Sequence, residues 1–180
     1  MTADLMAVGS VLIAFVLVIW WRCRQRRRQR DADAWLPQEL RTAKLAYAER
    51  LFRSNGRIRI SARVDRAYRD QVGQLTLVEL KTRDRDTIYP SDVIELSAQR
   101  VALMAATGEA VSARAYVLAQ GIDGEGRRVH RVDLLTQARV ASLAERRQAL
   151  LTGEAQARRT CIRGLCDSCA FVEPCRKPPP

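Results

Sequence analysis

The spacing of apolar residues changes along this sequence, and each spacing predicts a particular kind of element. Residues 57–65 (RIRISARVD) alternate strictly between polar and apolar, which predicts a half-buried strand with a basic outer face. Residues 74–81 are apolar on both faces, as is typical of a central strand. Helical spacing predicts helices over residues 38–52 and 91–106, and Ser91 suits the cap of the second helix.

The chain after this second helix predicts two more strands and a last helix. The strands are expected over residues 112–120 and 128–135, on either side of the turn sequence GIDGEG, and the helix over residues 136–153. The order helix, strand, strand, helix, strand, strand, helix predicts the α/β class, as a sandwich and not a doubly wound sheet. The sequence contains no glycine-rich phosphate loop, which argues against nucleotide-binding folds.

An uncharged segment near the N-terminus predicts a single transmembrane anchor. It begins with Leu5 and ends with Trp21, and its 17 residues span roughly 25 Å as a helix, which is enough to cross the core of a bilayer. Six arginines follow in residues 22–30, so we expect a single-pass protein of the inner membrane whose C-terminal side faces the cytoplasm. A cleaved signal peptide would instead carry basic residues before the apolar segment, where this chain has Asp4.

Charge and length limit the partners and the number of domains. The 180 residues include 31 Lys and Arg against 20 Asp and Glu, and the formal charge of +11 favours an anionic partner such as nucleic acid or anionic lipid. We expect residues 1–30 to form the anchor with its basic run, and residues 31–37 a linker. Residues 38–153 would then form one globular core, followed by a cysteine cluster and a disordered tail in residues 154–180.

A carboxylate and an amine stand two residues apart in the expected central strand. Side chains at this spacing share a face, so we expect Glu79 and Lys81 to lie side by side. If the preceding turn centres near Gln71, Asp65 pairs close to Leu77 and becomes a diagonal neighbour of Glu79. A Mg²⁺ or Mn²⁺ ion fits between two such carboxylates, where it would polarise a phosphate beside Lys81. The simpler alternative is an ion pair of Glu79 and Lys81 without a chemical role.

The sequence RVD followed by VELK resembles the PD-(D/E)XK nuclease superfamily, whose members hydrolyse phosphodiester bonds with a divalent metal. The positions that match the catalytic motif are Asp65, Glu79 and Lys81. The resemblance implies that Asp65 and Glu79 bind the metal and that the Leu80 carbonyl also contacts it. It further implies a restriction-endonuclease-like core, in which helices flank a central mixed sheet.

One match narrows the resemblance toward RecB-like nucleases, and two positions depart from their pattern. Gln99 stands where those proteins carry a Gln-x-x-x-Tyr motif that touches DNA and the metal site. Leu103 occupies the tyrosine position, and Ala62 replaces a glycine that is common before the aspartate. Members of the family usually add a metal ligand from the first helix, and the candidates here are Glu39 and Glu49, of which we prefer Glu49.

Four cysteines gather near the C-terminus, at Cys161, Cys166, Cys169 and Cys175. Such density in a chain that faces the cytoplasm predicts a bound metal or cluster instead of disulfides, and thiolates suit either Zn²⁺ or iron-sulfur. The spacing resembles the [4Fe-4S] site of CRISPR-associated RecB-like exonucleases. Those proteins take their first cysteine from before the core, where this chain offers Cys23, but we expect Cys161 to serve instead.

These expectations combine into a metal-dependent DNA nuclease, expected to act as an exonuclease on single strands or ends and to be held at the inner face of a membrane. Arg57, Arg59, Arg63 and Arg83 would hold the DNA backbone, unless they only form a solvated face. His130 is expected to be structural. The alternative function is a catalytically inactive, membrane-tethered nucleic-acid-binding or scaffold protein with a zinc or iron-sulfur staple.

Overall fold

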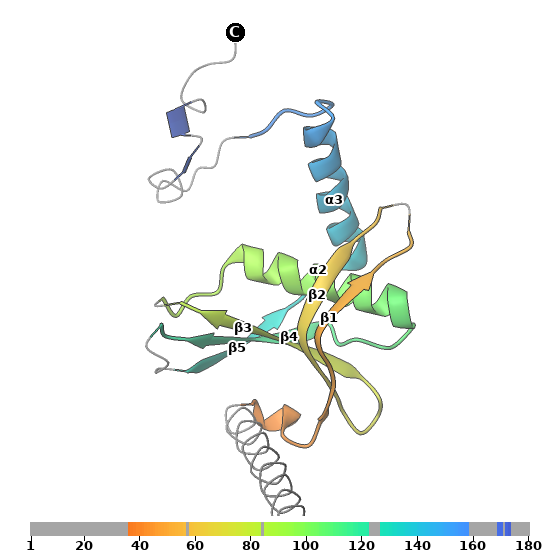
Figure 1. Cartoon of the computed structure of the whole chain (residues 1–180), viewed down its shortest axis with the longest axis vertical. Helices are drawn as coiled ribbons and strands as arrows, with labels where there is room; N and C mark the ends of the chain where they lie inside the picture. Colours follow the sequence, from red (N-terminus) through yellow and green to blue (C-terminus); the bar gives the residue numbers. More distant parts are fainter. Residues whose placement is uncertain are drawn as a thin grey trace, which may run out of the picture. The chain divides into compact units, whose positions relative to one another are not determined.

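The core is a five-stranded sheet made of β1 (Lys44–Arg53), β2 (Ser61–Arg69), β3 (Leu75–Thr82), β4 (Arg114–Gln120) and β5 (Arg128–Asp133). The strands lie in the order β1-β2-β3-β4-β5 (Figure 1). Neighbours run antiparallel except β3 and β4, which are parallel, so the sheet is mixed. β3 is the middle strand, which confirms the prediction for residues 74–81 to within one residue.

The computed structural model describes residues 36–56, 58–83, 85–122, 127–158, 169–170 and 172–173. The predicted anchor, together with Arg57, Cys161, Cys166 and Cys175, lies outside these ranges. A search of the described ranges found no helix with the length and apolar character that a membrane crossing requires. The chain divides into two units, Met1–Val140 and Ala141–Pro180, and the sheet belongs to the first.

The helix α2 (Pro90–Thr107) connects β3 to β4, because parallel neighbours need a crossover between them. It covers one face of the sheet (Figure 1). Leu96 and Leu103 of α2 pack there with Leu75, Leu77 and Val117 in one buried cluster. This cluster is the main apolar core of the first unit.

A smaller apolar cluster covers the opposite face of the sheet. It contains Val78 of β3, Tyr68 of β2, and Leu36 and Leu40 at the short 3-10 helix η1 (Gln38–Leu40). Successive residues of β3 therefore contact opposite clusters, as in a strand that is covered on both sides. Glu79 is two residues beyond Leu77 and faces α2.

The predicted helix over residues 38–52 is wrong. The chain forms η1, a turn, and then β1, which pairs with β2 along its whole length. Leu51, which a helix would bury, is 46% exposed, whereas the neighbouring Phe52 is 4% exposed. Pairing with β2 and burial of Phe52 outweigh the helical preference of this segment.

The turn between β2 and β3 lies one position later than predicted, and the register changes accordingly. Asp70 donates its backbone N–H to the Gln74 carbonyl, and Gly73 turns the chain with a φ of 86°. Ala67, and not Asp65, pairs with Leu77. Since β2 continues to Arg69, Asp65 lies in the middle of its strand instead of at the end.

The ribbon of β1 and β2 bends where Asp65 lies. Tyr47 and Phe52 of β1 contact the same core cluster although they are an odd number of residues apart, and so do Val64 and Ala67 of β2. A regular strand would turn such residues to opposite faces. Glu49 lies in this interval of β1 with a φ of 49°. In both strands, therefore, the alternation of side chains between the two faces is interrupted at this point, and residues on either side of it contact the same core cluster.

The last two helices begin and end close to the predicted residues. α2 starts at Pro90, and its N-cap is Tyr89, so the predicted cap at Ser91 is wrong. The Tyr89 backbone N–H donates to Asp92 Oδ2 at 2.9 Å, which closes the first turn of the helix. α3 (Gln137–Leu151) forms within the predicted range of residues 136–153.

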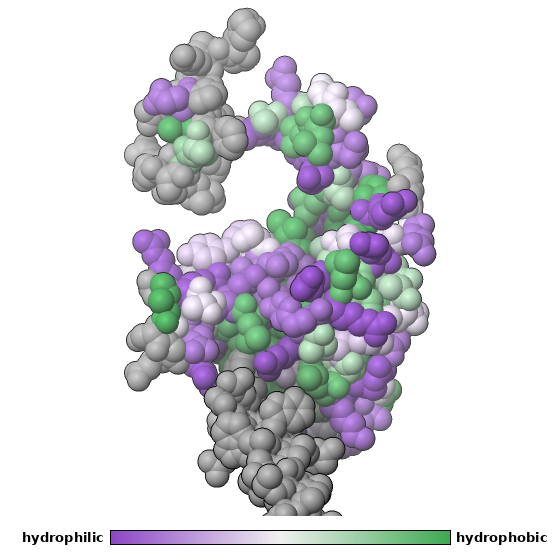
Figure 2. Space-filling model, viewed as in Figure 1, coloured by the Kyte–Doolittle hydropathy of each residue, from purple (hydrophilic) through white to green (hydrophobic). Residues whose placement is uncertain are grey.

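The described surface is mainly polar. Hydrophilic residues cover most of the face seen in Figure 2, and apolar side chains lie in separate small patches. Exposed apolar residues include Val72 and Ile122, which lie in the connections between strands. The polar cluster that bears on function lies instead between β3 and α2.

Candidate active site

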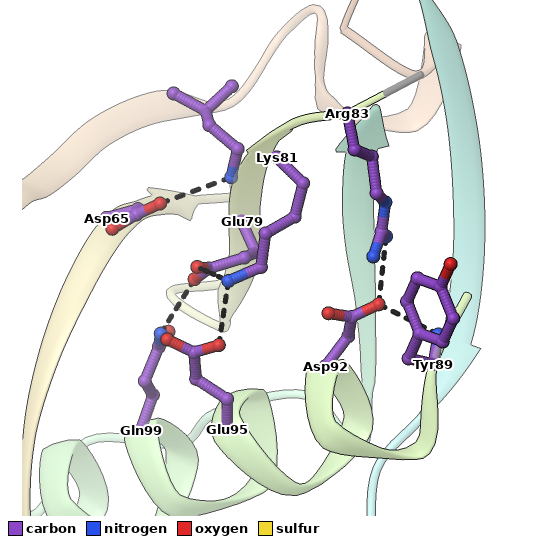
Figure 3. A network of polar contacts seen from close by, with 9 residues as sticks. Asp65, Glu79, Lys81, Arg83, Tyr89, Asp92, Glu95 and Gln99 are labelled. Atoms are coloured by element: carbon purple, nitrogen blue, oxygen red, sulfur yellow. Dashed lines mark hydrogen bonds and ion pairs between the residues drawn. The ribbon is translucent and has the colours of Figure 1, made fainter. Parts of the chain in front are cut away.

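The first part of the site is the contact between β2 and β3 at the bend of the ribbon. The backbone pairs of these two strands end at Arg66 and Val78. Beyond that pair, the Asp65 carboxylate accepts a hydrogen bond from the Leu80 backbone N–H at 3.2 Å (Figure 3). The Asp65 carboxylate thus takes the place of a backbone carbonyl in the next hydrogen bond between β2 and β3. It lies close enough to Glu79 for its charge to act on that carboxyl.

Glu79 carries a carboxylate in the interior of the sheet face that α2 covers. Its side chain is 4% exposed. Oε1 accepts from Lys81 Nζ at 2.7 Å and Oε2 accepts from Gln99 Nε2 at 2.7 Å. Each oxygen of this buried carboxylate therefore has its own donor, one from β3 and one from α2.

Lys81 has a second acidic partner that sequence reasoning missed. Its ammonium also contacts Glu95 Oε2 at 2.7 Å. Figure 3 shows the side chains of Glu79, Lys81, Glu95 and Gln99 turned toward one another between β3 and α2. Glu95 precedes Gln99 by one helical turn, and this i, i+4 spacing on α2 was the available signal.

Burial and neighbouring charges set the protonation of the site. Burial raises the pKa of the Glu79 carboxyl, hydrogen bonds from Lys81 and Gln99 oppose that shift, and the charges of Asp65 and Glu95 add to it. Burial acts to lower the pKa of Lys81, but its hydrogen bonds to Glu79 and Glu95 outweigh burial and raise that pKa above the ordinary value. Lys81 is therefore a charged donor at neutral pH and not a base.

A second group of polar contacts fixes the start of α2. Arg83 is the first residue after β3, and its guanidinium pairs with the Asp92 carboxylate at 2.8 Å. The same guanidinium lies 4.9 Å from the centre of the Tyr89 ring. Because Asp92 also caps the helix, these contacts link the end of β3 to the first turn of α2. They hold the helix in the orientation that turns Gln99 toward Glu79.

A comparison with known protein families identifies the superfamily of this chain. A family model described as the PD-(D/E)XK nuclease superfamily matches residues 7–176. The chain belongs to this superfamily. PD-(D/E)XK proteins are generally nucleases, so this member is expected to be one. The mixed sheet with its helices fits the PD-(D/E)XK core.

Solved structures resemble this PD-(D/E)XK chain at low sequence identity. One of them, titled "Crystal structure of SSO0001", is 17% identical with a TM-score of 0.47, and the match covers 72% of this chain and 59% of the other. The chain thus spans less than two thirds of the length of that structure. A search of the curated proteins found no match.

PD-(D/E)XK nucleases typically use Mg²⁺ or Mn²⁺, and the residues here fit such an ion in chemical type. Asp65 and Glu79 supply carboxylate oxygens, which hard cations prefer. Gln99 Oε1 is buried and has no hydrogen-bond partner among the described residues, so an acceptor for a water molecule lies directly beside Glu79. The contact of the Leu80 carbonyl with a metal stays a prediction.

Gln99 holds the position that the resemblance assigns to contacts with DNA and with the metal site. Its side chain is buried and donates to Glu79, so its part in the site is to orient that carboxylate, and its contact with DNA stays a prediction. Glu49 is exposed on β1, not on a helix, and the described residues contain no group of three His, Cys, Asp or Glu side chains placed to hold a metal. Glu39 instead accepts a hydrogen bond from Tyr116. Glu49 as a third metal ligand stays a prediction.

The predicted DNA-binding arginines fall into two kinds. Arg59 and Arg63 are exposed and remain candidates. Arg83 is largely buried and paired with Asp92, so its first role is structural. His130 contacts Asp86, which also binds Arg128, and this agrees with the predicted structural role.

The predicted cysteine site lies mostly outside the described residues. Cys169 is described and exposed, and Cys161, Cys166 and Cys175 lie outside the described residues. The iron-sulfur cluster therefore stays a prediction.

Proposed function

We propose that this chain is a divalent-metal-dependent nuclease that hydrolyses phosphodiester bonds of DNA. The observation that carries the proposal is the buried Glu79 carboxylate on the central strand, with Lys81 on one oxygen, Gln99 on the other, and Asp65 beside it. A buried ion pair is a poor source of stability, because desolvation of both charges offsets their attraction. The arrangement is better explained by chemistry at this site.

The chain's residues would divide the reaction between them. Hydrolysis forms a bond from a water oxygen to phosphorus, breaks the bond to one ester oxygen, and moves a proton to that leaving oxygen. A metal held by Asp65, Glu79 and the Leu80 carbonyl would polarise the phosphate and lower the pKa of a bound water. Lys81 would stabilise the negative charge on the phosphoryl oxygens, because it stays protonated. Gln99 would keep Glu79 in place.

The DNA would lie along the basic side of β2. Arg63 is exposed on β2 and Arg59 is exposed just before it, and the excess of basic residues over acidic ones supports an anionic substrate. Binding through the phosphate backbone suits single-stranded DNA and DNA ends. We propose that the enzyme acts on them as an exonuclease. We further propose that residues 5–21 anchor the enzyme at the inner membrane.

Substitutions that keep side-chain size test the nuclease directly. In the full chain, Glu79→Gln, Asp65→Asn and Lys81→Met should each lower the rate of cleavage of labelled single-stranded DNA with Mn²⁺ by about 100-fold or more, because each removes a charge used in the reaction. Glu145→Gln and Asp133→Asn are matched controls, since both residues are exposed and belong to neither the network around Glu79 nor the contacts of α2. These controls should cleave at the wild-type rate.

The inactive alternative gives a different result. If wild-type protein with Mg²⁺ or Mn²⁺ leaves DNA intact but still binds it, the chain is a nucleic-acid-binding or scaffold protein. If cleavage occurs but survives Glu79→Gln, the activity comes from elsewhere and the assigned site is wrong.

A further inference from the structure

Glu95 gives Lys81 a second acidic contact, and the two contacts differ in exposure. The ammonium lies 2.7 Å from both Glu79 Oε1 and Glu95 Oε2. The side chain of Glu79 is 4% exposed, whereas that of Glu95 is 50% exposed. A half-exposed ion pair contributes little stability, so the contact with Glu95 can be exchanged for another anion at low cost. The contact with Glu79 lies inside the site and is retained.

The backbone of α2 keeps Glu95 over Lys81. Glu95 and Gln99 are separated by one helical turn and both face β3, where each contacts one member of the Glu79 and Lys81 pair. The link between Arg83 and Asp92 fixes the start of the same helix. Glu95 is therefore held over the ammonium by the helix and not only by the ion pair.

The charges show what Glu95 does to an incoming phosphate. Two carboxylates, those of Glu79 and Glu95, contact the ammonium, and Asp65 adds a third negative charge near Glu79, so an approaching phosphodiester is repelled by each of them. A phosphate oxygen is also the same kind of acceptor as a carboxylate oxygen. Of the three carboxylates, Glu95 is the most exposed, and the oxygen that it offers to Lys81 stands where a phosphate oxygen would have to be received.

We propose that Glu95 is a positioning residue that holds the Lys81 ammonium over Glu79 until the scissile phosphate takes its place. This inference rests on the proposed nuclease function and assigns a role to a residue outside its motif. Before substrate binds, Glu95 keeps the flexible lysine side chain in one orientation. When substrate binds, the phosphate oxygen replaces Glu95 as the second acceptor of Lys81.

Two substitutions of Glu95 separate its orientation of Lys81 from the competition of its negative charge with the phosphate. Glu95→Gln keeps an acceptor oxygen for Lys81 but removes the negative charge, so KM should fall about 4-fold while kcat stays near the wild-type value. Glu95→Ala removes both, so KM should fall to a similar extent while kcat drops about 10-fold, because the lysine is no longer oriented. A merely structural role would lower kcat and stability together and would not be rescued by Gln.

Binding provides a readout that does not depend on cleavage. The fluorescence anisotropy of a labelled single-stranded oligonucleotide, measured on the full chain without divalent metal, should show about 4-fold tighter binding for Glu95→Gln, and the gain should shrink as salt is raised. The control Glu145→Gln removes the same charge from an exposed helix position and should bind as the wild type does.

The outcomes separate this inference from the proposed function. Unchanged or weaker binding and an unchanged or higher KM in Glu95→Gln would overturn the role of Glu95, even if the wild-type enzyme cleaves DNA. Failure of the wild type to cleave overturns the nuclease, and the anisotropy result then still decides whether Glu95 competes with a phosphate for Lys81.

Discussion

Glu79 is a residue whose environment opposes its own charge. Burial favours the protonated carboxyl, and the donors Lys81 and Gln99 compensate for lost water. A carboxylate kept in this condition suits a cation, because a cation would remove the repulsion from Asp65 and Glu95 that now acts on it. The raised pKa and the neighbouring carboxylates are thus consistent with the divalent cation that PD-(D/E)XK nucleases typically use.

The raised pKa of Glu79 should be visible in the pH dependence of unfolding. Because the folded-state pKa of Glu79 is raised, the unfavourable contribution of its charge is fully present above that pKa and is relieved as the pH falls toward the ordinary value of a glutamate. We predict that lowering the pH from 7 toward about 4 raises the urea midpoint of the wild type relative to that of Glu79→Gln, so the difference between the two midpoints changes with pH. Glu145→Gln should show no such pH-dependent gap, and a constant gap for Glu79→Gln would contradict the explanation.

At the scale of elements, sequence patterns were reliable where one periodicity dominated. β3 was predicted to within one residue because its apolar positions on both faces match a strand between two neighbours. The segment over residues 38–52 was mispredicted because its helical spacing is real but pairing with β2 decides its structure. Glu95 and Asp92 were missed for a related reason: both acquire partners only when α2 packs against β3.

The start of α2 depends on the pair of Arg83 and Asp92. We predict that Asp92→Ala lowers the free energy of unfolding by about 3 kcal/mol, because it leaves a largely buried guanidinium unpaired. The double variant Asp92→Ala with Arg83→Met should recover part of this loss, as urea unfolding of the single and double variants would show. If Asp92→Ala costs no more than Asp133→Ala, where the aspartate is exposed, the pair does not hold the helix.

At the scale of the whole molecule, the sequence predicts three functions in one chain: an anchor, a nuclease core and a cysteine cluster. The core is now described, and its superfamily is established over residues 7–176. The register of Asp65 could not be predicted from sequence to the residue, because it depends on where the turn between β2 and β3 closes, which is set by the pairing of Asp70 with Gln74 and by Gly73. The motif residues themselves could be predicted, because their spacing on β3 fixes the face they share.

The cysteine cluster can be tested on the intact chain. We propose a [4Fe-4S] cluster, and anaerobically purified protein should then be brown, absorb near about 400 nm and contain about four irons per chain. Cys169→Ser should lose the absorbance, whereas Cys23→Ser should keep it, since we expect Cys161 to complete the set. Colourless protein that contains zinc would show instead a tetrahedral thiolate site.

All members of the polar network are close together in the chain. The contacts of Asp65 with Leu80, Lys81 with Glu95, and Gln99 with Glu79 join residues 15, 14 and 20 positions apart. Closing such short loops costs little entropy. During synthesis, the ribosome has therefore delivered every group of the network before the first residue of β4 is made. A ribosome-bound nascent chain already contains every residue of the network, and β4 and β5 then add Val117 and Val132 to the core against which α2 packs.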